Sequence, residues 1–274
     1  RVICRDPHVE SRMKKIGIGY ENYKEFIDQN LYYVDKTLLV RDILEKGGKV
    51  TLLTRPRRFG KTLGLSMLRT FFELEYDREG KPVDKKRYFQ GMKIMEEGVD
   101  ILSRMGQYPV IKMSLKSAKQ PDFATAFLML RKEIVDEFGR HAYLLDSPLL
   151  QEKDRERFRE LLLGEITWSR MEKEFRSRDE REAALEKERG KYVSALQILS
   201  SLLEIYHKKK VIILLDEYDV PLENAWKDGF YPEMIAFVRS LFESALKTND
   251  ALEFAVITGC LRISRESIFT GMNH

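Results

Sequence analysis

The chain has 274 residues, of which 43% are hydrophobic and 34% charged, so it is long enough for one large α/β domain, with or without a small second one. No apolar run approaches the roughly 20 residues of a membrane-spanning helix, and the polar N-terminal segment has no signal-peptide pattern. The net charge of +4 is mild, the four histidines are scattered, and Cys4 and Cys260 lack metal-ligand spacing. We therefore expect a cytoplasmic protein with no membrane partner.

The first predicted elements are a helix, a strand and a second helix. Residues 32–48 show an apolar stripe at helical spacing, with Asp35 as the expected N-cap and two glycines at the end. Residues 49–54 form a short apolar run that predicts a buried strand, and residues 62–74 return to helical spacing. The intervening loop therefore joins a strand to a helix.

A second strand is expected at 109–115, and a helical pattern covers about 117–208. Within that pattern, residues 152–191 include twelve acidic and twelve basic residues and few apolar ones. This composition favours a solvated helical hairpin or a small lid. Because its charges balance and its apolar residues are sparse, we expect the segment to be a mobile helical insertion outside the sheet core. Insertions of this length usually carry function.

Two further strands complete the predicted sheet. Residues 208–221 run from an apolar strand into acids, residues 233–247 form an amphipathic helix, and residues 252–264 include a fourth strand and its exit loop. Because apolar strands alternate with helices, we predict an α/β fold, a single domain over 1–274 whose parallel sheet is covered by helices on both faces. The strands are expected near residues 50–54, 109–115, 211–215 and 253–257, with the first beside the last.

The loop after the first strand reads TRPRRFGKT and matches the end of the phosphate-binding P-loop pattern, G-x-x-x-x-G-K-[ST]. Gly60 permits a tight turn, Lys61 is placed to reach the β- and γ-phosphates of a nucleotide, and Thr62 to bind Mg²⁺. The first glycine of the pattern is replaced by Arg55, and Pro56 makes the entry to the loop rigid. The alternative is a chance GKT sequence in a basic turn.

Positive charge is concentrated on this loop. Residues 46–72 include seven basic residues and no acid, which suits a polyanion such as a nucleoside triphosphate. A nucleic-acid patch is the competing interpretation, although few aromatic residues are interleaved with the basic ones. Arg57 and Arg58 are expected to steer or bind phosphate, unless one of them pairs with Asp219. The expected nucleotide contacts are Arg57, Arg58, Phe59, Gly60, Lys61, Thr62 and Leu63.

A second motif, VIILLDEYD, ends the third strand in acids. An acid at the end of a buried strand is costly to desolvate unless it meets a cation, so Asp216 is expected to orient Mg²⁺ and its water shell. Glu217 is then the general base that polarises the attacking water. The alternative is a strand that ends in a solvated acidic turn.

An additional strand separates the two motifs, and a glutamate follows Asp216. Together these features indicate the additional-strand, catalytic-glutamate type of P-loop NTPase. In such sheets the strand after the acids lies between the two motifs, so Thr258 at its tip is expected to contact the γ-phosphate or the water. Arg262 is expected to reach the γ-phosphate in cis, or in trans from a second copy in a homo-oligomer. The alternative for Arg262 is a surface position.

Four segments carry a resemblance to a known family: YYVDKTLLVRDIL, TLLTRPRRFGKTLGLSML, VIILLDEYDVPL and ALKTNDALEFAVITGCLRISRESIFTGMN. In this order they resemble the AAA-ATPase-like family of bacterial proteins over about residues 15–274. The missing first glycine belongs to that family's own pattern, RPRRFGKT. Members often continue into a nuclease-like domain of the PD-(D/E)XK type, so the resemblance implies that this chain is truncated after His274. The nucleotide site that it implies consists of Lys61, Thr62, Asp216 and Glu217.

Two functions are consistent with these motifs. The first is Mg²⁺-dependent ATP binding and hydrolysis that drives or gates an attached effector domain. The second is a nucleotide-gated interaction or signalling module with negligible turnover. Glu217 favours the first. ATP is favoured over GTP because no guanine-reading N-K-x-D motif is present in the sequence.

Overall fold

The computed structural model describes residues 14–17, 19–164 and 177–260. Its helices are α1 (Tyr23–Asp28), α2 (Leu39–Lys46), α3 (Lys61–Phe72), α4 (Val99–Leu102), α5 (Phe123–Arg140), α6 (Glu152–Leu163), α8 (Arg178–Tyr192), α9 (Ala195–His207), α10 (Val220–Asp228) and α11 (Tyr231–Phe242). Its strands are β1 (Val50–Thr54), β2 (Val110–Ser114), β3 (Val211–Asp216) and β4 (Leu252–Gly259). Short 3₁₀ segments lie at Lys86–Tyr88, Lys93–Glu96, Lys116–Ala118 and Ala142–Asp146, and a π-helical turn at Glu243–Lys247.

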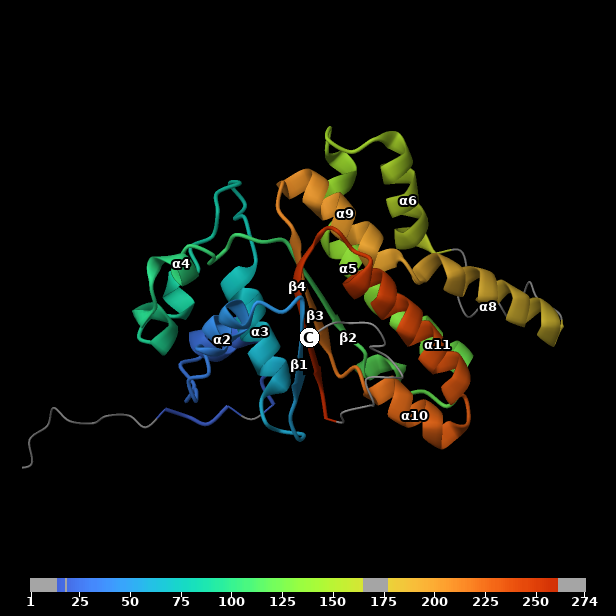
Figure 1. Ribbon diagram of the computed structural model, residues 1–274, viewed down its shortest axis with the longest axis horizontal. Coiled ribbons are helices and arrows are strands. Elements are labelled where there is room, and N and C mark those ends of the chain that lie inside the picture. Colours follow the sequence, from blue (N-terminus) through green and yellow to red (C-terminus); the bar gives the residue numbers. More distant parts are fainter. Residues whose placement is uncertain (1–13, 18, 165–176, 261–274) are drawn as a thin grey trace, which may run out of the picture.

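The four strands form one sheet in the order β1-β4-β3-β2 (Figure 1). Every neighbouring pair is parallel. Helices connect successive strands and bring each one back to the same end of the sheet, which is what parallel pairing requires. The predicted α/β class, the four strands and the pairing of the first strand with the fourth are confirmed.

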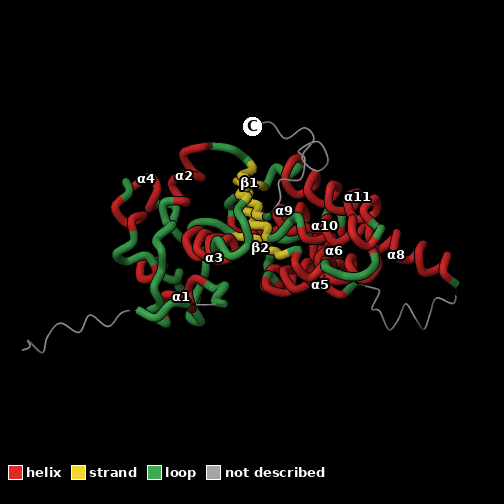
Figure 2. The backbone as a smooth tube through the Cα atoms, turned by 90° about the horizontal axis from the view of Figure 1, so that it is seen from below, coloured by secondary structure: helices red, strands yellow, loops and turns green. Residues whose placement is uncertain are grey.

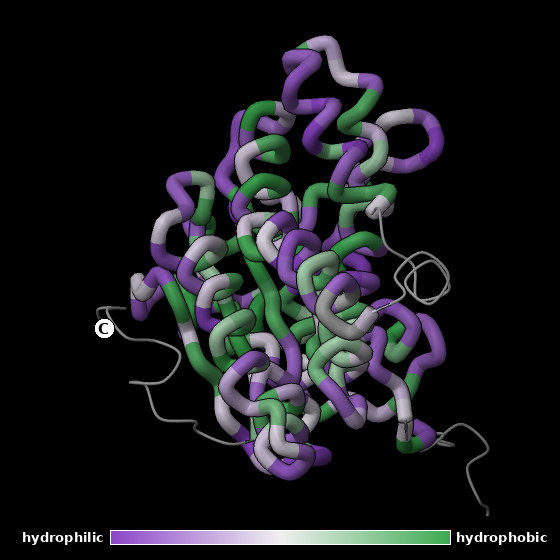
Figure 3. The backbone as a smooth tube through the Cα atoms, turned by 90° about the vertical axis from the view of Figure 1, so that its right-hand side faces the viewer, coloured by the Kyte–Doolittle hydropathy of each residue, from purple (hydrophilic) through white to green (hydrophobic). Residues whose placement is uncertain are grey.

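Helices cover both faces of the sheet (Figure 2). Helices α1 to α4 lie on one face, and α5, α6 and α8 to α11 lie on the other. Alternate side chains of β3 serve the two layers: Ile212 and Leu214 pack under α3, whereas Ile213 and Leu215 pack under α5 and α11. Apolar residues accordingly concentrate on the strands and the inner helix faces (Figure 3). Within the described ranges, no helix is both long and apolar enough to cross a bilayer.

The charged segment 152–191 is helical where the structure describes it, as α6 and α8. Its main contacts are with α5 and α9 and not with the strands. Some of its described apolar side chains nevertheless belong to the core on that face: Phe158 is fully buried against Phe138 of α5, and Tyr192, directly after the segment, is buried as well. The segment is therefore anchored at both of its ends, and its mobility stays a prediction.

The first predicted helix begins later than expected. Helix α2 starts at Leu39, so Asp35 is not its N-cap. The Asp35 carboxylate instead accepts hydrogen bonds from the backbone N–H groups of Thr37 and Lys93, both at 2.8 Å. This contact ties the segment before α2 to a distant loop, which local helix signals do not reveal. Gly47, with φ +63°, ends the helix as predicted.

Candidate functional site

The carboxyl ends of β1, β4 and β3 meet at one end of the sheet (Figure 1). Thr54 at the end of β1 is in register with Gly259 at the end of β4. Strand β3 ends at Asp216, one residue beyond the pairing of Leu215 with Ile257. Ligands of parallel α/β sheets usually bind outside such strand ends. The sheet therefore brings together motifs that are far apart in the chain.

The loop between β1 and α3 turns sharply into the helix. Gly60 has φ +74° and caps α3 in the left-handed conformation that glycine adopts without strain. Arg58 has φ +69°, which is uncommon for a residue with a Cβ atom and typical of functional loops. Among the described residues no side chain caps α3, and its first turn has no acid. The free backbone N–H groups and the positive end of the helix dipole are suited to a phosphate.

The side chain of Lys61 folds back over the loop that precedes it. Its ammonium group donates hydrogen bonds to the carbonyl oxygens of Arg55, at 2.8 Å, and Pro56, at 3.1 Å. It also lies 3.2 Å from the Sγ atom of Cys260, the residue that follows β4. The predicted phosphate-binding lysine thus lies between the β1 loop and the tip of β4.

Asp216 and Thr258 are both buried and in direct contact. The Oδ1 atom of Asp216 accepts hydrogen bonds from the Thr258 hydroxyl group and from the backbone N–H of Glu217, the latter at 3.0 Å. Its Oδ2 atom accepts no hydrogen bond from the part of the chain that the structure describes. The two hydrogen bonds fix the orientation of the carboxylate and leave one oxygen for another ligand.

The available oxygen atoms fit Mg²⁺. This ion usually takes one or two protein ligands and fills its remaining positions with phosphate oxygens and water. The Asp216 carboxylate and the Thr62 hydroxyl, in the first turn of α3, are ligands of this kind. No three His, Cys, Asp or Glu side chains in the described ranges gather into a metal site of their own. The arrangement suits a metal ion that arrives together with a phosphate group.

Glu217 has a backbone conformation that is unusual for its residue type. Its φ is +54°, in the left-handed region, and such strained residues often occur at functional sites. Burial and the neighbouring charge of Asp216 raise the pKa of the Glu217 carboxyl, while Lys116 and Lys61 act in the opposite direction. A raised pKa makes this carboxylate a better proton acceptor near neutral pH.

The other predicted contact residues surround the loop. Arg57 and Arg58 are exposed, and Arg57 lies 3.6 Å from Glu223 of α10. The partner considered for these arginines, Asp219, instead accepts the backbone N–H of Cys260 at 2.8 Å. Arg57 is therefore held by a helix that the sequence analysis did not connect with the site.

The remaining predicted contact residues are Phe59, Leu63 and Arg262, and they differ in where the structure places them. Phe59 is exposed on the loop, and its carbonyl oxygen accepts a hydrogen bond from Lys36 at 2.9 Å. Leu63 packs against the core beneath α3, so that its side chain serves the fold and its backbone is the part that a ligand can reach. Arg262 lies outside the described residues. The contact from Lys36 was missed because nothing in the sequence relates residue 36 to residue 59.

Gly259 was also missed by the sequence analysis. An added Cβ atom would come within 2.5 Å of the Tyr218 ring and 2.7 Å of the Asp219 carboxylate. Its signal in the sequence is a glycine directly after an apolar strand, which often marks a close backbone approach. The turn that carries Glu217 can pack against the tip of β4 only because this position has no side chain.

Replacing Gly259 by alanine is expected to lower the free energy of unfolding by about 1–3 kcal/mol, the usual cost of overpacking. Chemical denaturation measures the effect. The matched control is Gly190→Ala in α8, where an added Cβ atom meets nothing within 4 Å. It should raise the stability by about 0.5–1 kcal/mol. A Gly259→Ala protein as stable as the wild type would show that the turn moves aside without cost.

The fold and the site define an α/β protein whose parallel sheet carries its polar residues at one edge, next to a helix N-terminus. The family described as "Predicted AAA-ATPase" matches residues 17–269. The chain therefore belongs to the AAA-ATPase-like family, as the sequence motifs had suggested. Membership of this family suggests that the protein binds ATP.

One curated relative is similar over almost the whole chain. It is the "Uncharacterized protein in vnfD 5'region" of Azotobacter chroococcum mcd 1, 25% identical over 264 residues. The match covers 95% of this chain but only 40% of the relative. No solved structure matches the chain.

Proposed function

We propose that the protein binds ATP together with Mg²⁺ at the edge formed by β1, β4 and β3, and that it hydrolyses the γ-phosphate. The observation that carries the proposal is that the tip of β4 joins two distant motifs. Cys260 contacts Lys61, at the start of a helix without a side-chain cap among the described residues, and Thr258 contacts Asp216, the neighbour of Glu217. Phosphate groups bound at the start of α3 would compete with the loop carbonyls for the Lys61 ammonium.

Each residue has a separate role in the proposed reaction. Bound Mg²⁺ would neutralise charge on the phosphates, and Thr62 and Asp216 are the residues that would hold it. Glu217 accepts a proton from the attacking water, and Thr258 holds Asp216 in place by the hydrogen bond already described. Arg262 follows the tip of β4 in the sequence and supplies a positive charge to the γ-phosphate, from the same chain or from a second copy.

The proposed output is movement of an attached part of the protein. The match covers 40% of the curated relative. A protein of the relative's length would have room for an effector, such as the nuclease-like domain that the resemblance implies. ATP is the proposed nucleotide because the sequence has no guanine-reading motif.

The Lys61→Ala variant tests whether this site binds nucleotide. Calorimetric titration with ATP and Mg²⁺ should show an affinity at least about tenfold lower than in the wild type, because the ammonium makes charge-assisted contacts with phosphate. The control is Lys132→Ala, since Lys132 is exposed on α5 and pairs with Asp136 of the same helix. Unchanged ATP affinity in Lys61→Ala would refute the site. A large loss of thermal stability would show that Lys61 is structural.

A further inference from the structure

A cleft of about 860 Å³ lies beside β2. One wall is a single face of α3, which presents Ser66, Arg69 and Thr70, continued by Glu73 directly after the helix. Part of β2, the end of α5, residues of and before α1, the segment after α3, and the end of α9 line other parts of the cleft. The volume is within the usual range for small-molecule sites, about 300–1,000 Å³.

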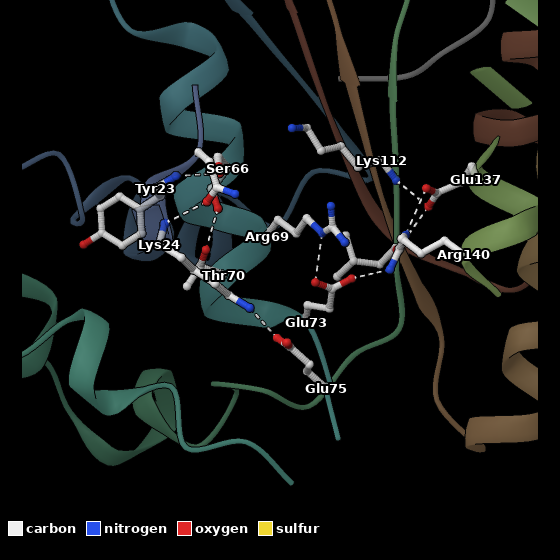
Figure 4. A network of polar contacts seen from close by, with 12 residues as sticks. Tyr23, Lys24, Ser66, Arg69, Thr70, Glu73, Glu75, Lys112, Glu137 and Arg140 are labelled. Atoms are coloured by element: carbon white, nitrogen blue, oxygen red, sulfur yellow. Dashed lines mark hydrogen bonds and ion pairs between the residues drawn. The ribbon is translucent and has the colours of Figure 1, made fainter. Parts of the chain in front are cut away.

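Charged side chains of this cleft are locked to one another. Glu73, directly after α3, pairs with Arg69 at 2.8 Å and with Arg140 of α5 at 2.6 Å. Arg140 also pairs with Glu137, which accepts the backbone N–H of Lys112 at 2.9 Å (Figure 4). The carboxylates of Glu73 and Glu137 are therefore both paired with arginine side chains, and these ion pairs hold the wall in place.

Lys112 is the exception to this pairing. Its side chain leaves β2 on the face where Val110 and the adjacent Leu214 are apolar core residues. It is partly buried, yet within the described ranges its ammonium group forms no hydrogen bond or ion pair. Figure 4 shows it extending toward α3, while Arg69 extends from α3 toward β2. Burial and the nearby charge of Arg69 lower the pKa of Lys112, and Asp216 and Glu21 oppose this effect.

Positive charge exceeds negative charge around the cleft. Its acids Glu73 and Glu75, with the adjacent Glu137, face the cations Lys24, Arg69, Lys112 and Arg140 and the adjacent Lys85. Another acid of the cleft, Glu21, is paired with Lys116, at 3.6 Å. The charge of Asp216 also acts on Lys112, so the remaining excess is one positive charge. This excess favours an anion such as a phosphate monoester, which carries about −1.5 to −2 at pH 7.

Another part of the cleft lining, here called the aromatic end, consists of Tyr143, Tyr206 and His207. The rings of Tyr143 and Tyr206 are 5.3 Å apart, and His207 lies 4.8 Å from Tyr206. The Tyr143 hydroxyl group is 2.9 Å from Nε2 of His207. Burial, followed by the charge of His141, lowers the pKa of His207 to about 4, so this wall is uncharged at neutral pH. It offers ring faces and edges to a planar ligand.

We infer that this cleft binds a small phosphate monoester with an aromatic ring, with the phosphate between Arg69 and Lys112 and the ring against Tyr143 and Tyr206. The residues that line the cleft differ from those of the proposed nucleotide site, although α3 contributes to both and the charge of Asp216 reaches Lys112. Lys112, which has no carboxylate partner within the described ranges, favours the phosphate group. The aromatic end favours the ring, and the ion pairs around Lys112 fix the shape of the site.

Titration of the 274-residue chain with phenyl phosphate tests the inference. The Lys112→Met variant should bind it at least about tenfold more weakly than the wild type, because it loses a charge-assisted contact with phosphate. Lys132→Met, which removes an exposed lysine, and Lys61→Ala should leave the affinity unchanged. Inorganic phosphate should bind more weakly than phenyl phosphate because it has no ring.

The same variants define the results that overturn the inference. If Lys112→Met and the wild type bind phenyl phosphate equally well, the phosphate does not bind at Lys112. Loss of binding in Lys61→Ala would mean that phenyl phosphate binds in the nucleotide site. Equal affinity for phenyl phosphate and inorganic phosphate would show that the aromatic ring makes no contribution to binding. Without ligand, Lys112→Met should have a higher melting temperature, since it buries no charge. A lower one would mean that Lys112 stabilises the fold and serves no ligand.

Discussion

Replacing Glu217 by glutamine is expected to lower ATP turnover by about 10²- to 10⁴-fold, the usual contribution of a general base. Glutamine keeps the size of the side chain and the left-handed turn but cannot accept a proton from water. Binding of ATP and Mg²⁺ should change little, because the contacts proposed for phosphate come from Lys61 and the start of α3. Steady-state phosphate release and calorimetric affinity measure the two quantities separately.

The control for this variant is Glu156→Gln, which alters an exposed residue of α6. It should leave turnover unchanged. If the wild type already hydrolyses ATP no faster than Glu217→Gln while both bind it, hydrolysis is not the function. The protein would then be the nucleotide-gated module that the sequence left as the alternative. Loss of binding in Glu217→Gln would contradict the assignment of Glu217 as a base.

Replacing Glu137 by alanine is expected to lower the free energy of unfolding by about 3–5 kcal/mol, the range for breaking a buried ion pair from one side. Glu137 is 6% exposed and pairs with Arg140. Its loss leaves the Arg140 guanidinium with one partner fewer and the backbone N–H of Lys112 without its acceptor. Denaturant unfolding measures the change, with Glu156→Ala as the exposed control.

The pH dependence of the same pair gives a second readout. Burial alone would raise the pKa of Glu137, but the nearby His141 ring, at 3.4 Å, and the hydrogen bonds from Arg140 outweigh it and lower the pKa from 4.5 to about 2. The folded protein therefore binds this proton less readily than the unfolded chain. The stabilisation from Glu137 is present above about pH 4.5 and is lost as the pH falls toward 2. A Glu137→Ala protein within about 1 kcal/mol of the wild type would contradict this role.

The sheet could be predicted from the sequence because its signals are local. Each strand is a short apolar run, and helical spacing between the runs implies parallel pairing. The strand–loop–helix context of Lys61 and the acids at Asp216 and Glu217 are local as well. The order of the motifs was enough to place Thr258 near them.

The features that could not be predicted depend on contacts between distant segments. The predicted start of α2 was wrong because the Asp35 carboxylate binds the backbone N–H of Lys93 and does not cap the helix. The partner of Arg57 was missed because Glu223 comes from a helix beyond the third strand. In the sequence, Lys112 is a single lysine in an apolar run. Its role can be inferred only from the sheet, where β2 is the last of the described strands.

The contacts that Glu137 and Arg140 make with β2 also affect how the sheet meets other molecules. An outer strand normally exposes backbone groups on which a strand of another chain can pair, and such pairing leads to aggregation. Here Glu137 occupies the N–H of Lys112 and Arg140 occupies the carbonyl of Val110. An incoming strand would have to displace both side chains before it could form its first hydrogen bonds there. Two side chains of α5 thus protect the first half of β2 against strand addition.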